Sequence, residues 1–199
     1  FAEAGIVAVS DALGKPESFS IYQDTLDAGK ASVRVYAMPE LTVSDALINT
    51  GIKTGFGNDM LKIGSIKIFE DGGMSNRMAA VGTPYQCEPY GKGLKVISRE
   101  DLIVAAKRIH TRGFQIAVHC QGDAGLADTL DAFEAVLGPQ STNPLRHRIE
   151  HAGCLFPDLL IRAANMNICV SSQPVFFSFL GEGFLNAFGN ETADLLYPF

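Results

Sequence analysis

The chain has 199 residues, of which 47% are hydrophobic and 19% are charged, and this composition is typical of a globular domain with a sizeable core. Its formal net charge of -6 disfavours binding to nucleic acid or to an anionic membrane, because both need clustered Lys and Arg. We therefore expect a small-molecule partner, no nucleic acid and no membrane.

The chain contains four cysteines, Cys87, Cys120, Cys154 and Cys169. No two of them form a Cys-x-x-Cys pair, which favours free thiols in a reducing compartment. The start of the chain lacks the pattern of a signal peptide, and the longest uncharged run, residues 163–181, contains Asn, Ser, Gln and Pro, unlike a membrane span. We expect a cytoplasmic protein. Because the chain starts at Phe1 without Met and stops at Phe199, we also expect a piece of something larger.

Short β-rich runs recur along the chain, and a helical pattern follows most of them. The predicted strands lie near residues 5–12, 31–39, 63–73, 114–123, 147–153 and 167–175. Several of these strands are apolar on both faces of the pleat, which is typical of parallel strands that are covered on each side.

Helices of ordinary length are predicted between the strands. Ser98-Arg-Glu-Asp predicts the start of a helix that runs to about His110. A second helix carries apolar residues at helical spacing, namely Leu126, Leu130, Phe133 and Leu137. A Gly- and Pro-rich stretch, residues 72–93, is expected to form a loop over an active site. No internal repeat or linker interrupts residues 1–199, so a single domain is predicted.

Sequential βα units fit either an open doubly wound sheet or a closed (β/α)8 barrel. A dinucleotide-binding sheet should show Gly-x-Gly-x-x-Gly after its first strand, and the sequence has no such motif. The sequence therefore favours the barrel, of which the six predicted strands would form only a part.

Three residues lie at the ends of predicted strands. Lys67 lies in "SIKIF", His119 ends "QIAVH", and His151 ends "RIEH". The carboxyl ends of barrel strands converge on one face, so these three side chains are predicted to share a site. A single His in an apolar strand is more often a hydrogen-bonded core residue than a ligand, but two His at matching strand ends favour a site.

Lys67 is unusual because its neighbours are apolar. A lysine that loses water must pair with an anion, lose its proton or be modified. A salt bridge from Lys67 to Glu70 or Asp71 is the simplest structural alternative. Among the other polar residues, Asp123 is expected to cap the following helix, and His147 is expected to be exposed at the entrance of its strand.

The stretch "HRIEHAG", residues 147–153, can be interpreted in two ways. On a helix, His147, Glu150 and His151 would form the His-x-x-Glu-His pattern of one class of zinc peptidases. Gly153 would end that helix after about two turns, which is too short for a catalytic scaffold. Because a strand is due after the preceding long helix, we predict a strand.

Four segments, taken together, resemble the metal-dependent amidohydrolase superfamily. They are "IKIFEDGG", "QIAVHCQGDAGLADTLDAFE", "HRIEHAG" and "VSSQPVF", in this order. The resemblance covers most of the chain and is strongest to the family-3 branch, which includes N-substituted formamide deformylase.

This resemblance implies a (β/α)8 TIM barrel that binds one or two divalent metals, usually zinc. The ligands would be His119, His151 and Lys67, the last carboxylated by carbon dioxide. The resemblance also implies hydrolysis of carbon-nitrogen bonds in amide-type substrates by a metal-activated hydroxide. Candidates for substrate contact are Arg77, Tyr85 and Gln173, and a surface or loop-packing role is the alternative for each of them. The residues expected to hold the ligands in place are Asp71, Asp123 and Glu150.

The sequence departs from this family at both ends of the barrel. It contains no His-x-His pair of the first strand, and it stops before the eighth strand, whose Asp would be the general base. The chain therefore resembles strands two to seven, so a homo-oligomer or association with the missing barrel segments is expected. One alternative is a catalytically incomplete fragment that acts as a non-enzymatic assembly.

Overall fold

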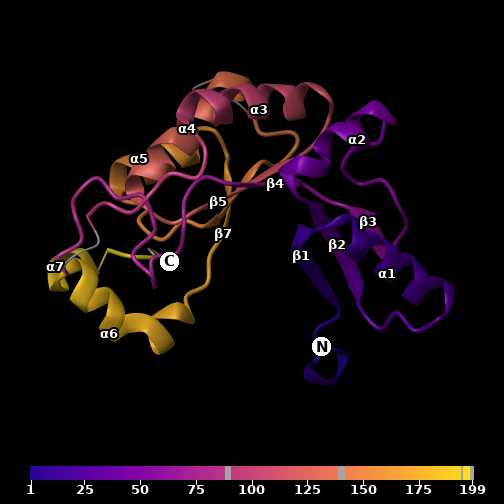
Figure 1. Ribbon diagram of the computed structural model, residues 1–199, viewed down its shortest axis with the longest axis horizontal. Coiled ribbons are helices and arrows are strands. Elements are labelled where there is room, and N and C mark those ends of the chain that lie inside the picture. Colours follow the sequence, from indigo (N-terminus) through magenta and orange to yellow (C-terminus); the bar gives the residue numbers. More distant parts are fainter. Residues whose placement is uncertain (88–90, 139–141, 194, 198–199) are drawn as a thin grey trace. The chain divides into compact units, whose positions relative to one another are not determined.

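The computed structural model describes residues 1–87, 91–138, 142–193 and 195–197 (Figure 1). Part of the predicted loop, residues 88–90, lies outside the described residues. The strands are β1 (Ala8–Gly14), β2 (Arg34–Pro39), β3 (Leu61–Ile63), β4 (Ile66–Phe69), β5 (Ile116–Cys120), β6 (Arg148–His151) and β7 (Cys169–Ser171). The helices are α1 (Pro16–Asp27), α2 (Ser44–Asn49), α3 (Arg99–Thr111), α4 (Asp123–Leu137), α5 (Pro157–Asn165), α6 (Phe176–Phe188) and α7 (Asn190–Ala193), with 3-10 turns at Ala2–Ala4 and Leu41–Val43.

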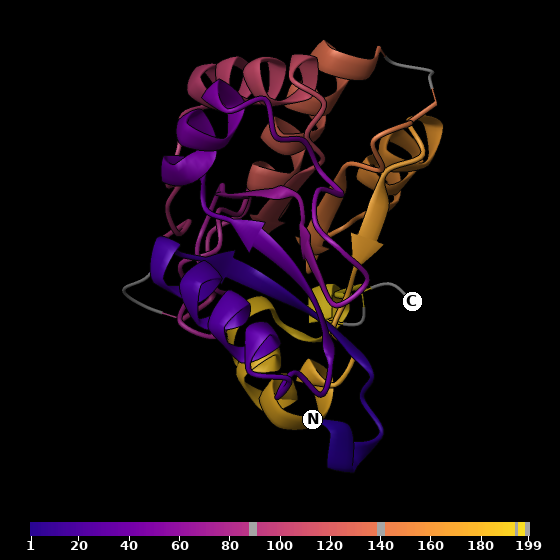
Figure 2. The same ribbon diagram turned by 90° about the vertical axis from the view of Figure 1, so that its right-hand side faces the viewer.

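The strands form two sheets in which neighbours in space are also neighbours in sequence. One sheet has the order β1-β2-β3 and the other the order β4-β5-β6-β7. The pairs β1-β2, β2-β3, β5-β6 and β6-β7 are parallel, and in Figure 2 the arrows of the later strands run in the same direction. This is the βαβ arrangement that the sequence predicts.

The predicted third strand is the element that differs most from expectation. Residues 63–73 were expected to form one strand, but the chain forms β3 and then β4, with Gly64 and Ser65 between them. Gly64 lies so close to β2 that a Cβ atom there would be 2.5 Å from the Tyr36 ring. The Gly64 N–H donates to the Ala37 carbonyl at 2.6 Å. A glycine is therefore required where the chain steps from one strand to the next.

The described residues pack into two compact units. The first comprises Phe1–Ile68 and Arg108–Ile116, and the second comprises Phe69–Lys107 and Ala117–Phe199. None of the helices in the described residues has the length and apolar character needed to cross a bilayer.

The first unit contains β1, β2 and β3 with α1 and α2. Its fully buried residues include Met38, Ile66, Ile68, Ile109 and Phe114. By contrast, β1 has a single buried residue and α1 has none. Strand β1 is at the edge of its sheet, which leaves its backbone open to further pairing.

The second unit contains residues 117–120 of β5, all of which are buried. Helices α4 and α5 lie beside one another on one side of β5 and β7 (Figure 1). The predicted apolar stripe of α4 is confirmed, since Leu126, Leu130 and Phe133 are fully buried. The start of α3 is confirmed as well, because the Asp101 N–H donates to Ser98 Oγ at 3.1 Å and this hydroxyl donates to Asp101.

Candidate functional site

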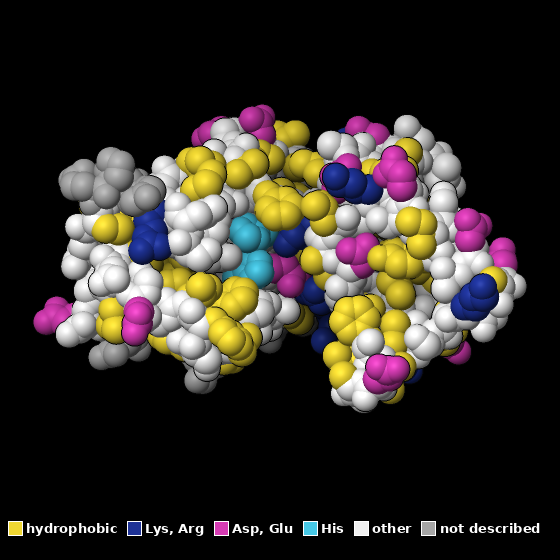
Figure 3. Space-filling view, turned by 60° about the horizontal axis from the view of Figure 1, so that its bottom comes forward, with side chains coloured by type: hydrophobic (Ala, Val, Ile, Leu, Met, Phe, Trp, Pro, Cys, Tyr) yellow, Lys and Arg dark blue, Asp and Glu magenta, His cyan; other side chains and the backbone are white. Residues whose placement is uncertain are grey.

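Two of the predicted metal ligands lie at the ends of neighbouring strands in the second unit. His119 is the fourth residue of β5, and His151 is the last residue of β6. The centroids of the two imidazole rings are 4.6 Å apart, and the rings meet edge to face at 74°. Histidine side chains also appear side by side at the surface in Figure 3 (cyan).

The backbone at the end of β6 turns the His151 ring towards His119. In the ladder, His119 pairs with Glu150 and Cys120 pairs with His151. Paired side chains share a face of the sheet, so a regular strand would point His151 away from His119. Instead, φ is 75° at His151 and 51° at Ala152, a left-handed conformation that residues other than glycine rarely adopt. Strain of this kind costs on the order of 1–3 kcal/mol per residue and clusters at functional sites.

Close packing holds the turn that follows β6. The Ala152 N–H donates to the Cys120 carbonyl at 3.0 Å, and the Cys154 N–H donates to the Gln121 carbonyl at 2.8 Å. A Cβ atom on Gly153 would lie 2.5 Å from the sulfur of Met74. The glycine in "HRIEHAG" is therefore needed for the close approach that fixes the end of β6.

The His151 ring is oriented by Gln173 and Phe176. Its Nδ1 hydrogen bonds to Gln173 Oε1. The Phe176 ring stacks nearly parallel to it, with centroids 6.2 Å apart and an interplanar angle of 22°. Gln173 was predicted to contact substrate, and in the structure it contacts this imidazole.

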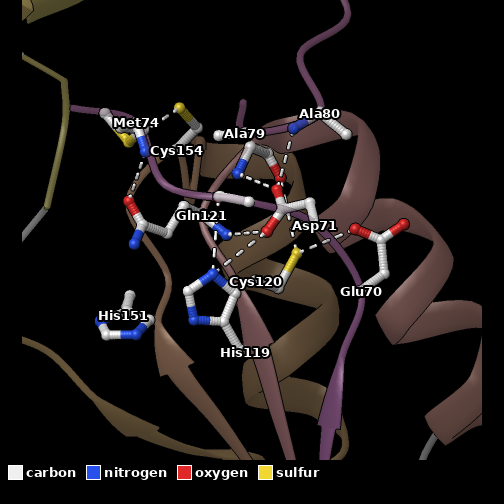
Figure 4. Close-up of polar contacts among 12 residues, drawn as sticks. Glu70, Asp71, Met74, Ala79, Ala80, His119, Cys120, Gln121, His151 and Cys154 are labelled. Carbon is white, nitrogen blue, oxygen red and sulfur yellow. Dashed lines mark hydrogen bonds and ion pairs between the residues drawn. The ribbon is translucent and has the colours of Figure 1, made fainter. Parts of the chain in front are cut away.

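The His119 ring faces two oxygen acceptors through its Nε2. This nitrogen lies 3.5 Å from the Gly72 carbonyl and 3.8 Å from Asp71 Oδ1 (Figure 4). Because a carbonyl oxygen only accepts, a hydrogen bond to Gly72 requires the tautomer with its hydrogen on Nε2 and its lone pair on Nδ1. His119 can therefore offer Nδ1 to a metal ion.

Asp71 is a buried carboxylate that holds backbone groups around the candidate site. Its Oδ2 accepts hydrogen bonds from the Ala80 and Gly122 N–H groups at 3.0 and 2.8 Å, and its Oδ1 accepts one from the Gln121 N–H at 3.0 Å (Figure 4). Burial raises the pKa of Asp71 to about 6, although these backbone donors lower it. Asp71 thus ties the loop after β4 to the end of β5 and contacts His119.

Glu70, Asp71 and Cys120 form a cluster that the sequence did not predict as a unit. One possible ligand atom from each lies within 4.8 Å of the others. The Cys120 thiol donates to Glu70 Oε2 at 3.7 Å. Burial raises the pKa of all three groups, which favours their protonated forms and opposes cation binding. In Figure 4 the Glu70 oxygen without a dashed line points away from Asp71.

Glu70 makes stability depend on pH. Burial, with the nearby charges of Asp71 and Asp128, raises the pKa of Glu70 from 4.5 to about 8. The folded state thus keeps a proton that the unfolded chain has lost. The contribution of Glu70 to the free energy of unfolding is therefore fully present below about pH 4.5. It is lost as the pH rises to about 8, by up to about 1.4 kcal/mol per pH unit.

We expect Glu70→Gln to remove this loss of stability. The free energy of unfolding is measured by urea titration with chelator present. The free energies of the variant and the wild-type protein should be similar at the acid end, and that of the variant should become the larger of the two between pH 5 and pH 8. A difference between the two proteins that stays constant with pH would contradict the raised pKa.

Two candidates for substrate contact, Arg77 and Tyr85, lie in the loop after β4 and donate hydrogen bonds to backbone carbonyl groups of the protein. Arg77 donates to the Ser75 carbonyl at 2.6 Å and to the Gly183 carbonyl of α6 at 3.1 Å. Tyr85 is buried, and its hydroxyl donates to the Ala79 carbonyl at 2.9 Å. These bonds attach the loop to itself and to α6.

Two expectations about single residues are wrong. His147 is fully buried and stacks on Phe133 at a centroid distance of 5.6 Å, because the turn before β6 packs it against α4. Asp123 is not an N-cap, since α4 begins with it and Gly122 is the capping residue. Asp123 Oδ1 instead accepts the N–H of Gly82 from the loop after β4, at 2.9 Å.

The remaining predicted residues lie in β4 and β6. Lys67 is buried between Ile66 and Ile68, with 3% of its surface exposed. Glu150 is buried and accepts a hydrogen bond from Arg148 Nε at 2.5 Å. Since Arg148–His151 is a strand, His147, Glu150 and His151 do not share a helical face, and the zinc-peptidase interpretation is wrong.

Comparison with known proteins decides the family. A profile described as the amidohydrolase family matches residues 1–199, the whole chain. The chain belongs to the amidohydrolase family. The chain is 34% identical over 116 residues to the putative amidohydrolase YtcJ of Bacillus subtilis (strain 168), and this match covers 58% of the chain and 21% of YtcJ. It is 27% identical over 166 residues to the protein LONG AFTER FAR-RED 3 of Arabidopsis thaliana, covering 83% of the chain and 28% of that protein.

Two solved structures resemble this chain closely. Both are uncharacterised metal-dependent hydrolases, one from Pyrococcus furiosus with a TM-score of 0.82 and 26% identity, the other from Pyrococcus horikoshii OT3 with 0.81 and 29%. Each match covers 96% of this chain but only 38% and 37% of the solved chains. The fold is therefore the α/β TIM-barrel type of metal-dependent hydrolases. The chain spans less than two fifths of the length of each of these four proteins.

Proposed function

We propose that the protein hydrolyses carbon-nitrogen bonds in amide-type small molecules with the help of a divalent metal, zinc in the first instance. His119, His151 and a carboxylated Lys67 would hold the metal, within a single barrel domain completed by segments outside this chain. The observation that carries this proposal is the edge-to-face pair of imidazoles at the ends of β5 and β6. Amidohydrolase membership and the metal-dependent neighbours support it.

The two imidazoles suit a zinc ion in their chemistry. Nitrogen ligands of neutral imidazole suit zinc, and ligating His rings usually donate their other N–H to a fixed acceptor. His151 has such an acceptor in Gln173, and His119 has the Gly72 carbonyl. The left-handed backbone at His151 directs its ring towards His119, which supports a shared role for the two imidazoles.

The burial of Lys67 supports its proposed modification. Burial penalises the charged form of an amine, and Lys67 is almost completely buried in β4. Reaction of the amine with carbon dioxide would replace this cation with a carbamate anion, whose oxygens can bind a divalent ion. This assignment rests on the burial of Lys67 and on the family resemblance of "IKIFEDGG".

When bound, a divalent metal lowers the pKa of water and polarises a carbonyl group. The chain's own contribution is to hold the imidazoles and to surround them with apolar groups. Phe69 lies 5.0 Å from the His119 ring and Phe176 lies 6.2 Å from the His151 ring, centroid to centroid. These aromatic rings restrict the positions that each imidazole can take.

The proposal is tested by metal content, mass and activity of the purified protein. We expect bound zinc, a native mass that falls by one carbon dioxide after acidification, and hydrolysis of simple N-substituted amides. Lys67→Ala should lose the mass difference and most of the activity. A protein that binds no divalent metal would reject the proposal, and a stable metal-free oligomer would favour the non-enzymatic assembly.

A further inference from the structure

We propose that Gln173 is a positioning residue that fixes both the tautomer and the ring orientation of His151 for metal binding. This inference rests on the proposed function above. It assigns Gln173 to the imidazole instead of to the substrate. The residues that make these contacts, His151, Ser171, Gln173 and Phe176, all belong to the second unit.

The orientation of the Gln173 amide follows from its second contact. Nε2 of Gln173 lies 2.9 Å from the Ser171 carbonyl oxygen. A carbonyl oxygen only accepts, so the amide must direct its nitrogen to Ser171 and its oxygen to His151. The alternative orientation, with the amide turned over, would place two oxygens against each other.

This amide orientation selects the tautomer of His151. Gln173 Oε1 contacts His151 Nδ1, and an amide oxygen cannot donate. Nδ1 therefore carries the hydrogen, and the neutral ring has its lone pair on Nε2. Neutral imidazole with a defined lone pair is the form that binds zinc.

The same residue also fixes the plane of the ring. His151 lies between the His119 ring at 4.6 Å and the Phe176 ring at 6.2 Å, centroid to centroid, which restrict it from two sides. The hydrogen bond to Gln173 fixes the remaining rotation about the Cβ–Cγ bond. Gln173 is itself anchored because its carbonyl accepts the Phe176 N–H at 3.0 Å, where α6 begins.

Two substitutions separate this role from simple packing. Gln173→Met keeps the side-chain length but removes the acceptor for Nδ1–H, and it should weaken zinc binding by about 10–100-fold, the usual effect of losing a partner of a ligating His. Gln173→Glu restores an acceptor for Nδ1–H while losing the donor to Ser171. It should bind zinc within a few-fold of the unchanged protein. Gln86→Met is the matched control, because Gln86 donates to the Phe188 carbonyl at 3.0 Å in the same unit but does not contact either imidazole.

Zinc affinity is measured by competition with a chelator at neutral pH, and the tautomer of His151 by nitrogen-15 NMR of the metal-free protein. We expect the Nδ1–H form in the unchanged protein and in Gln173→Glu, and a mixed population in Gln173→Met. Equal losses of affinity in Gln173→Met and Gln173→Glu, or an unchanged tautomer in Gln173→Met, would overturn the inference. If the unchanged protein binds no zinc, the proposed function fails instead, and the NMR result alone then decides whether Gln173 sets the tautomer.

Discussion

Replacing either His119 or His151 with alanine is expected to abolish metal binding. Each substitution removes one of two imidazole ligands whose rings are 4.6 Å apart. Loss of a residue that hydrogen bonds to a metal ligand typically weakens metal binding by up to about 100-fold. Loss of a ligand itself should weaken zinc binding by more than this. Hydrolysis should fall to background in both variants, and zinc content after dialysis measures the effect directly.

The other two histidines provide controls for this experiment. His110→Ala removes an imidazole at the end of α3 and should leave zinc content unchanged. His147→Ala removes the ring that stacks on Phe133, so it should lower the free energy of unfolding but keep the metal. Retention of zinc by both His119→Ala and His151→Ala would refute the assignment of these ligands.

Replacing Asp71 is expected to have the largest effect on stability. The Asp71 carboxylate is 1% exposed and accepts three backbone hydrogen bonds, from Ala80, Gln121 and Gly122. Asp71→Ala would leave these N–H groups without their acceptor. Each N–H group that stays buried would then destabilise the folded state by about 1–3 kcal/mol. We expect the free energy of unfolding to fall by at least about 3 kcal/mol in urea titrations with chelator present.

Asp71→Asn tests the same feature with little change in volume. One oxygen of the amide can still accept, but its NH2 group would face a backbone N–H, so an intermediate loss of stability is expected. Asp131→Asn is the matched control, because Asp131 makes partly exposed ion pairs with Arg99 and Arg162. Such pairs contribute about 0–1 kcal/mol. If Asp71→Asn and Asp131→Asn have equal effects, Asp71 does not hold the loop after β4 in place.

Asp71 also links stability to the candidate site. Its Oδ1 lies 3.8 Å from His119 Nε2, so the same carboxylate that anchors the loop also contacts a proposed ligand. Zinc binding by Asp71→Asn should therefore weaken even at temperatures where the variant remains folded. The comparison with Asp131→Asn, which is expected to bind zinc normally, separates this effect from general destabilisation.

The alternation of strands and helices was predictable from the sequence because it depends on local patterns. The apolar spacing of Leu126, Leu130 and Phe133 identified α4, and the Ser98 capping pattern identified the start of α3. The strand at "HRIEHAG" followed from Gly153 and from the order of elements. Parallel sheets then followed because consecutive strands were separated by helices.

The sequence also identified which residues lie at strand ends, but its spacing could not show how their side chains point. In β6 the regular alternation of faces would have directed His151 away from His119. The left-handed φ of His151 reverses that direction, and it is stabilised by the packing of Gly153 against Met74 and Gln121, two residues that are distant in sequence.

By itself, then, the sequence determined the order of elements, the parallel sheets and the histidines at the ends of β5 and β6, because these depend on periodicity and on short motifs. Only the tertiary structure decided the burial of His147, the separation of β3 from β4, the contacts of Asp71 and the pairing of Gln173 with His151. The physical reason is that each of these depends on an approach between residues far apart in the chain, with hydrogen bonds and excluded volume that local patterns do not contain.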